Sequence, residues 1–108
     1  MLFIGIDPGL HGAVSVLDHN GLRAVFDLPV MQDPIAGPNA KIQRKIDSHT
    51  LAALLLNACP ASEGKPTAVI EAVATMGDKN NSVQSQGSLL RTLGALEAVL
   101  ECLGWAPT

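Results

Sequence analysis

The chain has 108 residues, the size of one small domain, and we treat residues 1–108 as a single domain. Hydrophobic residues make up 47% of it and charged residues 16%, which excludes an intrinsically disordered protein. Seven lysines and arginines against ten acidic residues give a net charge of -3, which argues against coating nucleic acid by bulk charge alone. The apolar run at 1–6 ends at Asp7, too early for a secretory signal or a membrane span, so we expect a cytoplasmic protein.

Three short strands are predicted at the start of the chain. The run 2–7 is almost entirely apolar, which is typical of a strand buried on both faces. Pro8–Gly12 predicts a tight turn, because proline fixes φ and the glycines tolerate positive φ. Residues 13–17 predict a second strand, and Asn20-Gly21 is a hairpin signal before a third strand at 22–28. We therefore expect three antiparallel strands.

Residues 29–71 predict a loop, a helix and a further strand. Residues 29–46 show no period and contain three prolines, so we predict a long loop, which in so small a domain is usually functional. Asp47 or Ser48 is expected to cap a helix that ends before Cys59-Pro60, with one buried stripe formed by Leu51, Leu54, Leu55 and Ala58. Residues 67–71 form a second apolar run ended by an acid, and predict a strand.

A long helix is expected to close the chain. Ser82 is a candidate cap at its start and Gly104 a fitting end. A stripe of small residues, Gly87, Gly94 and Ala98, predicts close packing on that helix, against the sheet rather than a partner's helix. Cys59 and Cys102 lack metal-site spacing and are expected to be free, buried thiols.

The fold class that follows is α/β with a mixed sheet and the order βββαβα. Residues 105–108 look like the approach to another strand, where the chain stops. We therefore expect a fold that is cut short before a further strand.

Two acids that end apolar runs are the candidate catalytic and metal-binding residues. The strand at 67–71 follows a helical crossover, so it is expected to lie parallel to the first strand, with Asp7 beside Glu71. Adjacent strands lie about 4.8 Å apart, which lets both carboxylates reach one cation. A hard divalent ion such as Mg²⁺ or Mn²⁺ would remove their mutual repulsion. The residues leave a structural alternative open, in which Asp7 only begins an Asp-Pro-Gly turn and Glu71 only ends a strand.

The motif at 4–13, Ile-Gly-Ile-Asp-Pro-Gly-Leu-His-Gly-Ala, followed by Val69-Ile70-Glu71 and a glycine-containing helix, resembles the Holliday-junction resolvases of the RuvC type. These belong to the ribonuclease H-like superfamily, and the resemblance covers residues 2–105. It implies a Mg²⁺-dependent endonuclease that hydrolyses branched DNA as a homodimer, with Asp7 and Glu71 as catalytic metal ligands. It also implies further carboxylates on a C-terminal helix after a fifth strand, so we expect a C-terminally incomplete chain of uncertain activity.

Candidate nucleic-acid contacts come from two segments. Lys41, Arg44 and Lys45 gather in the predicted loop, and Lys79 follows Glu71, where each could hold a phosphate. By the resemblance, Met76 matches the position of an apolar wedge that holds bases unstacked. The alternatives are an ordinary solvated charge cluster and an ordinary core or surface methionine.

Two other functions stay open at this point. One is a ribonuclease H-like nuclease that acts on RNA, since such enzymes share a similar opening strand and turn. The other is a non-catalytic module that binds branched DNA or serves as a dimerisation partner. The missing further carboxylates keep the second of these open.

Overall fold

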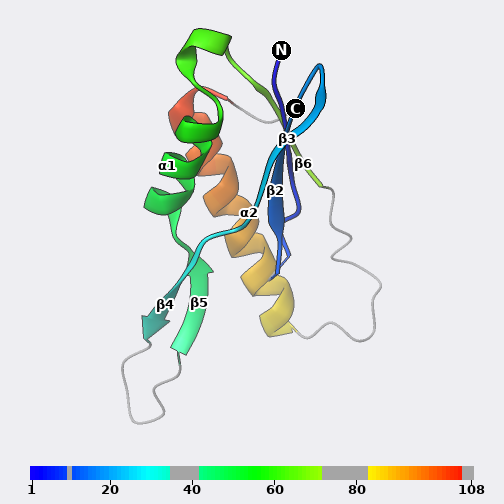
Figure 1. Cartoon of the computed structure of the whole chain (residues 1–108). Coiled ribbons are helices and arrows are strands. Elements are labelled where there is room, and N and C mark those ends of the chain that lie inside the picture. Colours follow the sequence, from blue (N-terminus) through cyan, green and yellow to red (C-terminus); the bar gives the residue numbers. More distant parts are fainter. Residues whose placement is uncertain (10, 35–41, 72–82, 106–108) are drawn as a thin grey trace.

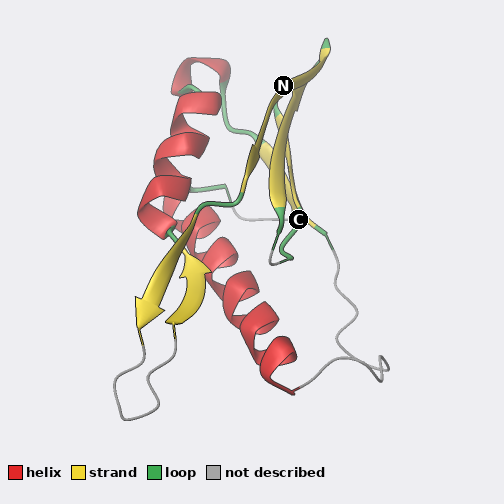
Figure 2. Cartoon of the chain, turned by 60° about the horizontal axis from the view of Figure 1, so that its bottom comes forward, coloured by secondary structure: helices red, strands yellow, loops and turns green. Residues whose placement is uncertain are grey.

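The computed structural model describes residues 1–9, 11–34, 42–71 and 83–105 (Figure 1). Within these ranges the chain forms six strands, two α-helices and one short 3-10 helix. Four strands make a mixed sheet, and both α-helices lie on the same face of it (Figure 2). The predicted α/β class with a mixed sheet is confirmed.

The three N-terminal strands form the predicted antiparallel set. They are β1 (Phe3–Ile6), β2 (Ala13–Asp18) and β3 (Gly21–Asp27), and β2 pairs with both of its neighbours. The hairpin between β2 and β3 turns where the Asn-Gly signal predicted it. Gly21 has a φ of 114°, a value that favours glycine, and the Asn20 N–H donates to Asp18 Oδ1 over 2.8 Å.

The strand β6 (Thr67–Ile70) lies parallel to β1 and gives the sheet order β3-β2-β1-β6. The register pairs Ile6 with Ile70. This arrangement is the one that the helical crossover predicted.

The prediction of a loop at 29–46 is wrong. The strands β4 (Val30–Pro34) and β5 (Ile42–Ile46) pair antiparallel in a separate two-stranded sheet, so the described order has two strands more than βββαβα. Period-2 alternation appears where one face of a strand is buried, and Val30 and Met31 are both exposed. The hairpin is therefore defined by its backbone hydrogen bonds, and the side-chain pattern does not predict it.

The helix α1 (Ser48–Ala58) starts and stops as predicted. Asp47 is its N-cap: its Oδ1 accepts from the Thr50 N–H over 3.1 Å and its Oδ2 from the Thr50 hydroxyl over 2.7 Å. Leu51 and Leu55 are buried. The helix ends at Cys59, whose N–H donates to the Leu55 carbonyl.

The helix α2 (Val83–Leu103) ends in a Schellman motif. Gly104 has a φ of 81°, its N–H donates to the Glu101 carbonyl, and the Trp105 N–H donates to the Leu100 carbonyl. The predicted end at Gly104 is confirmed, and buried Trp105 ties this terminus to the core. The predicted cap, Ser82, lies outside the described residues.

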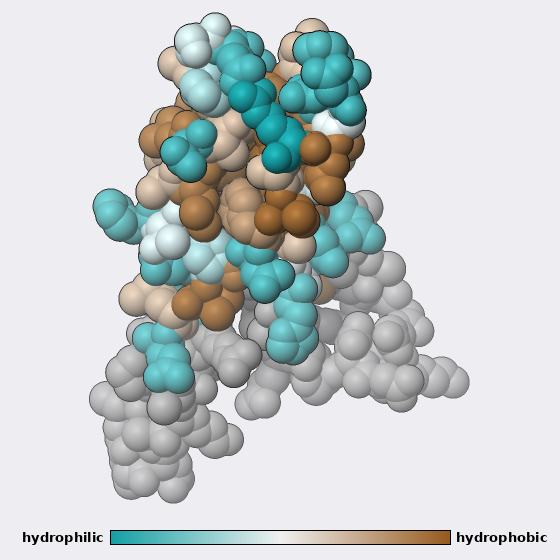
Figure 3. Space-filling view, in the orientation of Figure 1, coloured by the Kyte–Doolittle hydropathy of each residue, from teal (hydrophilic) through white to brown (hydrophobic). Residues whose placement is uncertain are grey.

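The core fills the space between the sheet and the two helices. The inner face of the sheet contributes Ile4, Ile6, Val14, Val16 and Ala68, and the helices contribute Leu51, Leu55, Leu96 and Leu100. The opposite sheet face keeps Phe3, Leu17, Val25 and Val69 exposed. Brown, apolar patches also reach the surface in the view of Figure 3. Neither described helix combines the length and apolar character that a bilayer crossing needs.

Two predictions about small side chains need correction. A Cβ built on Gly94 would meet nothing within 4 Å, and Ala98 is exposed, so this part of the small-residue stripe faces open space. Cys59 is free and buried as predicted, but Cys102 is free and exposed.

Candidate metal site and basic side chains

Asp7 and Glu71 lie side by side at one edge of the sheet. Each directly follows one member of the Ile6–Ile70 pair in the parallel strands β1 and β6. The Glu71 N–H donates to the Ile6 carbonyl over 2.8 Å, which continues the ladder to the acids themselves. Neighbouring strands lie about 4.8 Å apart. Both residues are exposed, so two carboxylates can approach one solvent-accessible cation.

The turn after β1 holds the carboxylate of Asp7. Its Oδ1 accepts from the Gly9 N–H over 3.0 Å, while the Asp7 N–H donates to the Ala13 carbonyl over 2.9 Å. The Gly12 N–H closes the turn on the Gly9 carbonyl over 2.8 Å. Because a carboxylate has about four acceptor positions, the turn bond is compatible with cation binding by the same group.

The turn has no room for a side chain at position 12, so a glycine is required there. A Cβ on this residue would lie 2.0 Å from the Asp7 carbonyl oxygen and 2.8 Å from both the Gly9 oxygen and Leu28 Cδ1. Neither Gly9 nor Gly12 has a positive φ, which corrects the reason expected from the sequence. Close backbone packing therefore fixes the position of Asp7.

A shallow depression adjoins the acid pair on the open face of the sheet. Asp7 and Glu71 line it together with Gly5, which has no side chain, and Ala13 and Ser15, whose side chains are small. A Cβ on Gly5 would lie 3.1 Å from Ser15 Oγ, so the depression depends on this glycine. It gives a substrate group access to both carboxylates from the uncovered face.

A third acid, Asp27, ends β3 in the same cross-strand row. Asp27 pairs with Ala13, and Ala13 in turn accepts the hydrogen bond from Asp7. The strand β2 therefore separates the two aspartates by about two strand spacings, roughly 10 Å. Consistent with this, no group of three or more His, Cys, Asp or Glu side chains among the described residues could hold one metal ion. The described donor set is the Asp7–Glu71 pair.

Most predicted nucleic-acid contacts lie outside the described part of the chain. Lys41, Met76 and Lys79 are not described, and neither is the side chain of Arg44, whose backbone belongs to β5. Lys45 is described: it is half-buried near the end of β5 and lines a cavity shared with α1 and α2.

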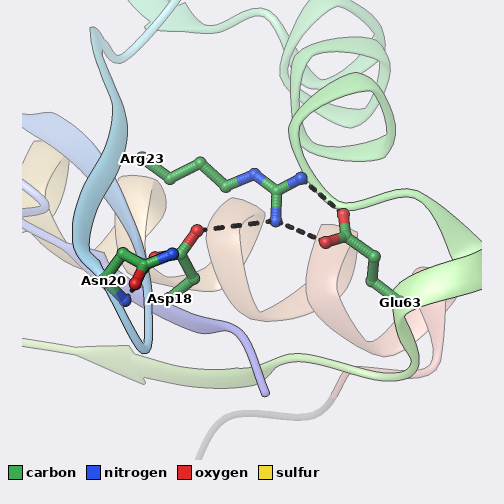
Figure 4. Close-up of polar contacts among 4 residues, drawn as sticks. All are labelled: Asp18, Asn20, Arg23 and Glu63. Atoms are coloured by element: carbon green, nitrogen blue, oxygen red, sulfur yellow. Dashed lines mark hydrogen bonds and ion pairs between the residues drawn. The ribbon is translucent and has the colours of Figure 1, made fainter.

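Arg23 forms an ion pair that sequence reasoning missed (Figure 4). Its guanidinium donates to both carboxylate oxygens of Glu63, over 2.8 Å to Oε1, and Asp18 Oδ2 lies 4.0 Å from Nη1. The hydrogen bond from Arg23 lowers the pKa of Glu63, and the same bond raises the pKa of Arg23. The pair joins β3 to the 3-10 helix η1 (Ala61–Glu63). The two partners are forty residues apart in sequence, so no local sequence pattern predicts this contact.

Comparison with known proteins adds no family assignment. Neither a scan against protein-family models nor a search of curated proteins finds a match for this chain. The functional argument therefore depends on the motif residues and on the geometry of the acid pair.

Proposed function

We propose that this chain is a ribonuclease H-like domain of the RuvC type, in which Asp7 and Glu71 bind Mg²⁺ or Mn²⁺ for hydrolysis of phosphodiester bonds in branched DNA. The observation that carries the proposal is the parallel pairing of β1 with β6, which brings the two acids together. The sheet order β3-β2-β1-β6, with both helices on one face, is compatible with such a domain.

The donor set suits one hard divalent cation. Mg²⁺ prefers oxygen ligands, keeps several waters, and commonly takes one or two carboxylates together with substrate phosphate. Asp7 and Glu71 supply the carboxylates, both exposed beside an open depression. When bound, the ion would neutralise phosphate charge and lower the pKa of a bound water.

The residues of the chain contribute position and access. The Asp7 turn and the ladder bond to Glu71 hold both carboxylates on backbone that is already ordered by the sheet. Preorganised charge of this kind needs little rearrangement when a substrate arrives. The absence of a side chain at Gly5 and the small side chain of Ser15 leave room for a phosphodiester next to the pair.

The resemblance also leads us to propose a homodimer that acts in the cytoplasm. A non-catalytic branched-DNA-binding module is the second candidate, favoured by the absence of a third metal-ligating side chain among the described residues. Cleavage and binding assays separate the two, because only the first candidate turns over substrate.

The proposal is tested with a labelled four-way DNA junction, with Mg²⁺ or with EDTA. We expect Mg²⁺-dependent cleavage, and a fall of about 100-fold or more in Asp7→Asn and Glu71→Gln, since each removes a ligand of an ion that contributes several kcal/mol. Glu97→Gln, which removes an exposed carboxylate on α2, is the matched control and should cleave like the wild type. Linear duplex and single-stranded RNA in parallel reactions identify the substrate class.

Metal binding is measured independently of cleavage, from the broadening of amide NMR signals by Mn²⁺. Signals of Gly5, Ala13 and Val69 should broaden in the wild type and in Glu97→Gln, but far less in Asp7→Asn. Equal broadening in Asp7→Asn, or equal cleavage, would refute the metal assignment. Junction binding without cleavage would support the non-catalytic module instead.

A further inference from the structure

The uncovered face of the four-stranded sheet presents its side chains in cross-strand rows. Both α-helices lie on the other face (Figure 2). Two rows are apolar or small, and they consist of Thr67, Phe3 and Leu17, and of Val69, Gly5, Ser15 and Val25. The row after these, at the carboxyl end of β1 and β6, holds the acid pair Asp7 and Glu71.

Phe3 is the exposed aromatic side chain of the molecule. The chain contains two phenylalanines, one tryptophan and no tyrosine. Phe26 is partly buried against the core and Trp105 is 8% exposed, whereas Phe3 is 47% exposed although its strand lies between β2 and β6. An apolar surface bordered by polar residues is typical of a binding site.

The exposed ring and the acid pair belong to one continuous surface. Ile4 and Ile6 are buried, so the alternation along β1 places Phe3, Gly5 and Asp7 on the uncovered face. Phe3 precedes Asp7 by four residues, which is about 13 Å along a strand. The depression beside the acids, about 340 Å³ in volume, includes Gly5 and so occupies the row between the two.

The charge on this face selects which part of a nucleic acid it can contact. The three rows contain no lysine or arginine among the described residues, and their acidic row also includes Asp27. Arg23 of β3 is engaged by both carboxylate oxygens of Glu63. Carboxylates repel phosphates except where a cation joins them, whereas neutral bases have π-faces that stack on aromatic side chains.

We propose that the uncovered sheet face binds unpaired nucleotides, with one base stacked on Phe3 and a phosphate at the cation held by Asp7 and Glu71. The inference rests on the proposed function and names its substrate as a strand whose bases are accessible. At a rise of about 3.4 Å per nucleotide, the 13 Å from Phe3 to Asp7 spans at most about four nucleotides. Stacking accepts every base, so Phe3 positions the strand without reading its sequence.

The first test compares a labelled single-stranded DNA with its duplex by fluorescence anisotropy. Ca²⁺ replaces Mg²⁺ as the oxygen-binding cation, and a denaturing gel verifies that the strand stays intact. The wild type should bind the single strand more tightly. Phe3→Ala should weaken this binding about tenfold and leave the slope of log K against log salt unchanged, because Phe3 is uncharged. Leu90→Ala, at a 57% exposed position on α2, is the matched control and should bind like the wild type.

Two further variants separate stacking from packing. Phe3→Leu keeps an apolar side chain without a π-face and should weaken binding nearly as much as Phe3→Ala. Phe3→Trp should bind at least as tightly, and its emission should be quenched by the single strand beyond the background of buried Trp105. Circular dichroism and thermal melting establish that each variant is folded. Wild-type affinity in Phe3→Leu, or unquenched emission in Phe3→Trp, would overturn the stacking contact.

The remaining outcomes separate this inference from the proposed function. Unchanged binding by Phe3→Ala, or tighter binding of the duplex by the wild type, would overturn the inference, while cleavage that needs Asp7 would leave the proposed function standing. Binding that needs Phe3 without any cleavage would refute the hydrolysis and leave the base contact standing. A wild-type dimer that Phe3→Ala dissociates in analytical ultracentrifugation would assign this face to a second copy of the chain and overturn the inference.

Discussion

The carboxyl edge of the four-stranded sheet and the cavity beside the β4–β5 hairpin, where Lys45 lies, differ in construction. At the sheet edge, backbone bonds place the two acids: Glu71 extends the β1–β6 ladder, and Asp7 is held by its turn. At the cavity, side chains from three elements converge, and their positions depend on how the hairpin packs on the helices. A site positioned by backbone hydrogen bonds should be disrupted by a substitution that adds atoms to the turn. A site positioned by packing should be disrupted by a substitution that removes side-chain atoms from the core beneath it.

The largest expected effect is that of Gly12→Ala at the sheet edge. Its Cβ would lie 2.0 Å from the Asp7 carbonyl oxygen, so the turn must shift. We expect a loss of about 3 kcal/mol in the free energy of unfolding, the upper range for overpacking. Urea denaturation measures the loss, and Mn²⁺ broadening of the Ala13 amide tests whether the acid pair is displaced. A variant of wild-type stability and wild-type Mn²⁺ binding would show that the turn does not constrain Asp7.

Truncating a core side chain below the cavity should have the next largest effect on the free energy of unfolding. Ile46 is 8% exposed at the end of β5, and Ile46→Ala should cost about 2 kcal/mol, the low end of the range because the residue lies at the edge of the core. Its cross-strand partner Val30 is 44% exposed, so Val30→Ala is the control and should change stability by less than about 0.5 kcal/mol.

The two regions should respond differently to Ile46→Ala. Amide NMR signals of Ser48 and Thr92, which line the cavity, are expected to shift, while Mn²⁺ broadening at Gly5 and Val69 should stay at the wild-type level. A loss of Mn²⁺ binding in this variant would mean that the sheet edge and the cavity are not independent.

The sheet edge could be predicted because its signals are local or topological. Apolar runs ended by Asp7 and Glu71 mark two strands, and the crossover rule makes those strands parallel. The Asn20-Gly21 turn and the Asp47 cap work in the same way, since each depends on residues only a few positions apart.

The cavity and the hairpin could not be predicted from the sequence in this way. Val30 and Met31 are both exposed, so no alternation of buried and exposed side chains separates this part of β4 from a loop. Arg91 reaches the cavity only through tertiary packing of α2 against β5. Gly94 was misinterpreted for a related reason, because a small side chain suits both a close approach and an open surface.

A smaller effect, of opposite sign, is expected at Gly94. This glycine lies inside α2 and a Cβ would meet nothing within 4 Å, so Gly94→Ala removes only the conformational cost of glycine. The free energy of unfolding should rise by up to about 1 kcal/mol. Urea denaturation measures it, with the wild type in the same series. Destabilisation by this variant would indicate that something packs on the exposed stripe in solution.

The smallest expected effect is the pH dependence contributed by Asp47, in the wall of the cavity. Hydrogen bonds from the Thr50 hydroxyl, and then from the Thr50 backbone N–H, hold the pKa of Asp47 below its ordinary value of 3.8. The folded state therefore favours the ionised form. Its stabilisation is fully present above the unfolded pKa and is lost as the pH falls through the lower folded value.

Asp47→Asn isolates this contribution, because asparagine caps a helix about as well as aspartate. The melting temperature of the variant should lie below that of the wild type at pH 7, and the difference should shrink as the pH is lowered past 3.8. Glu63→Gln is the comparison, since Arg23 lowers the pKa of Glu63 in the same direction from 4.5 at a site remote from the cavity. If the Asp47→Asn difference persists undiminished in acid, it reflects altered cap geometry.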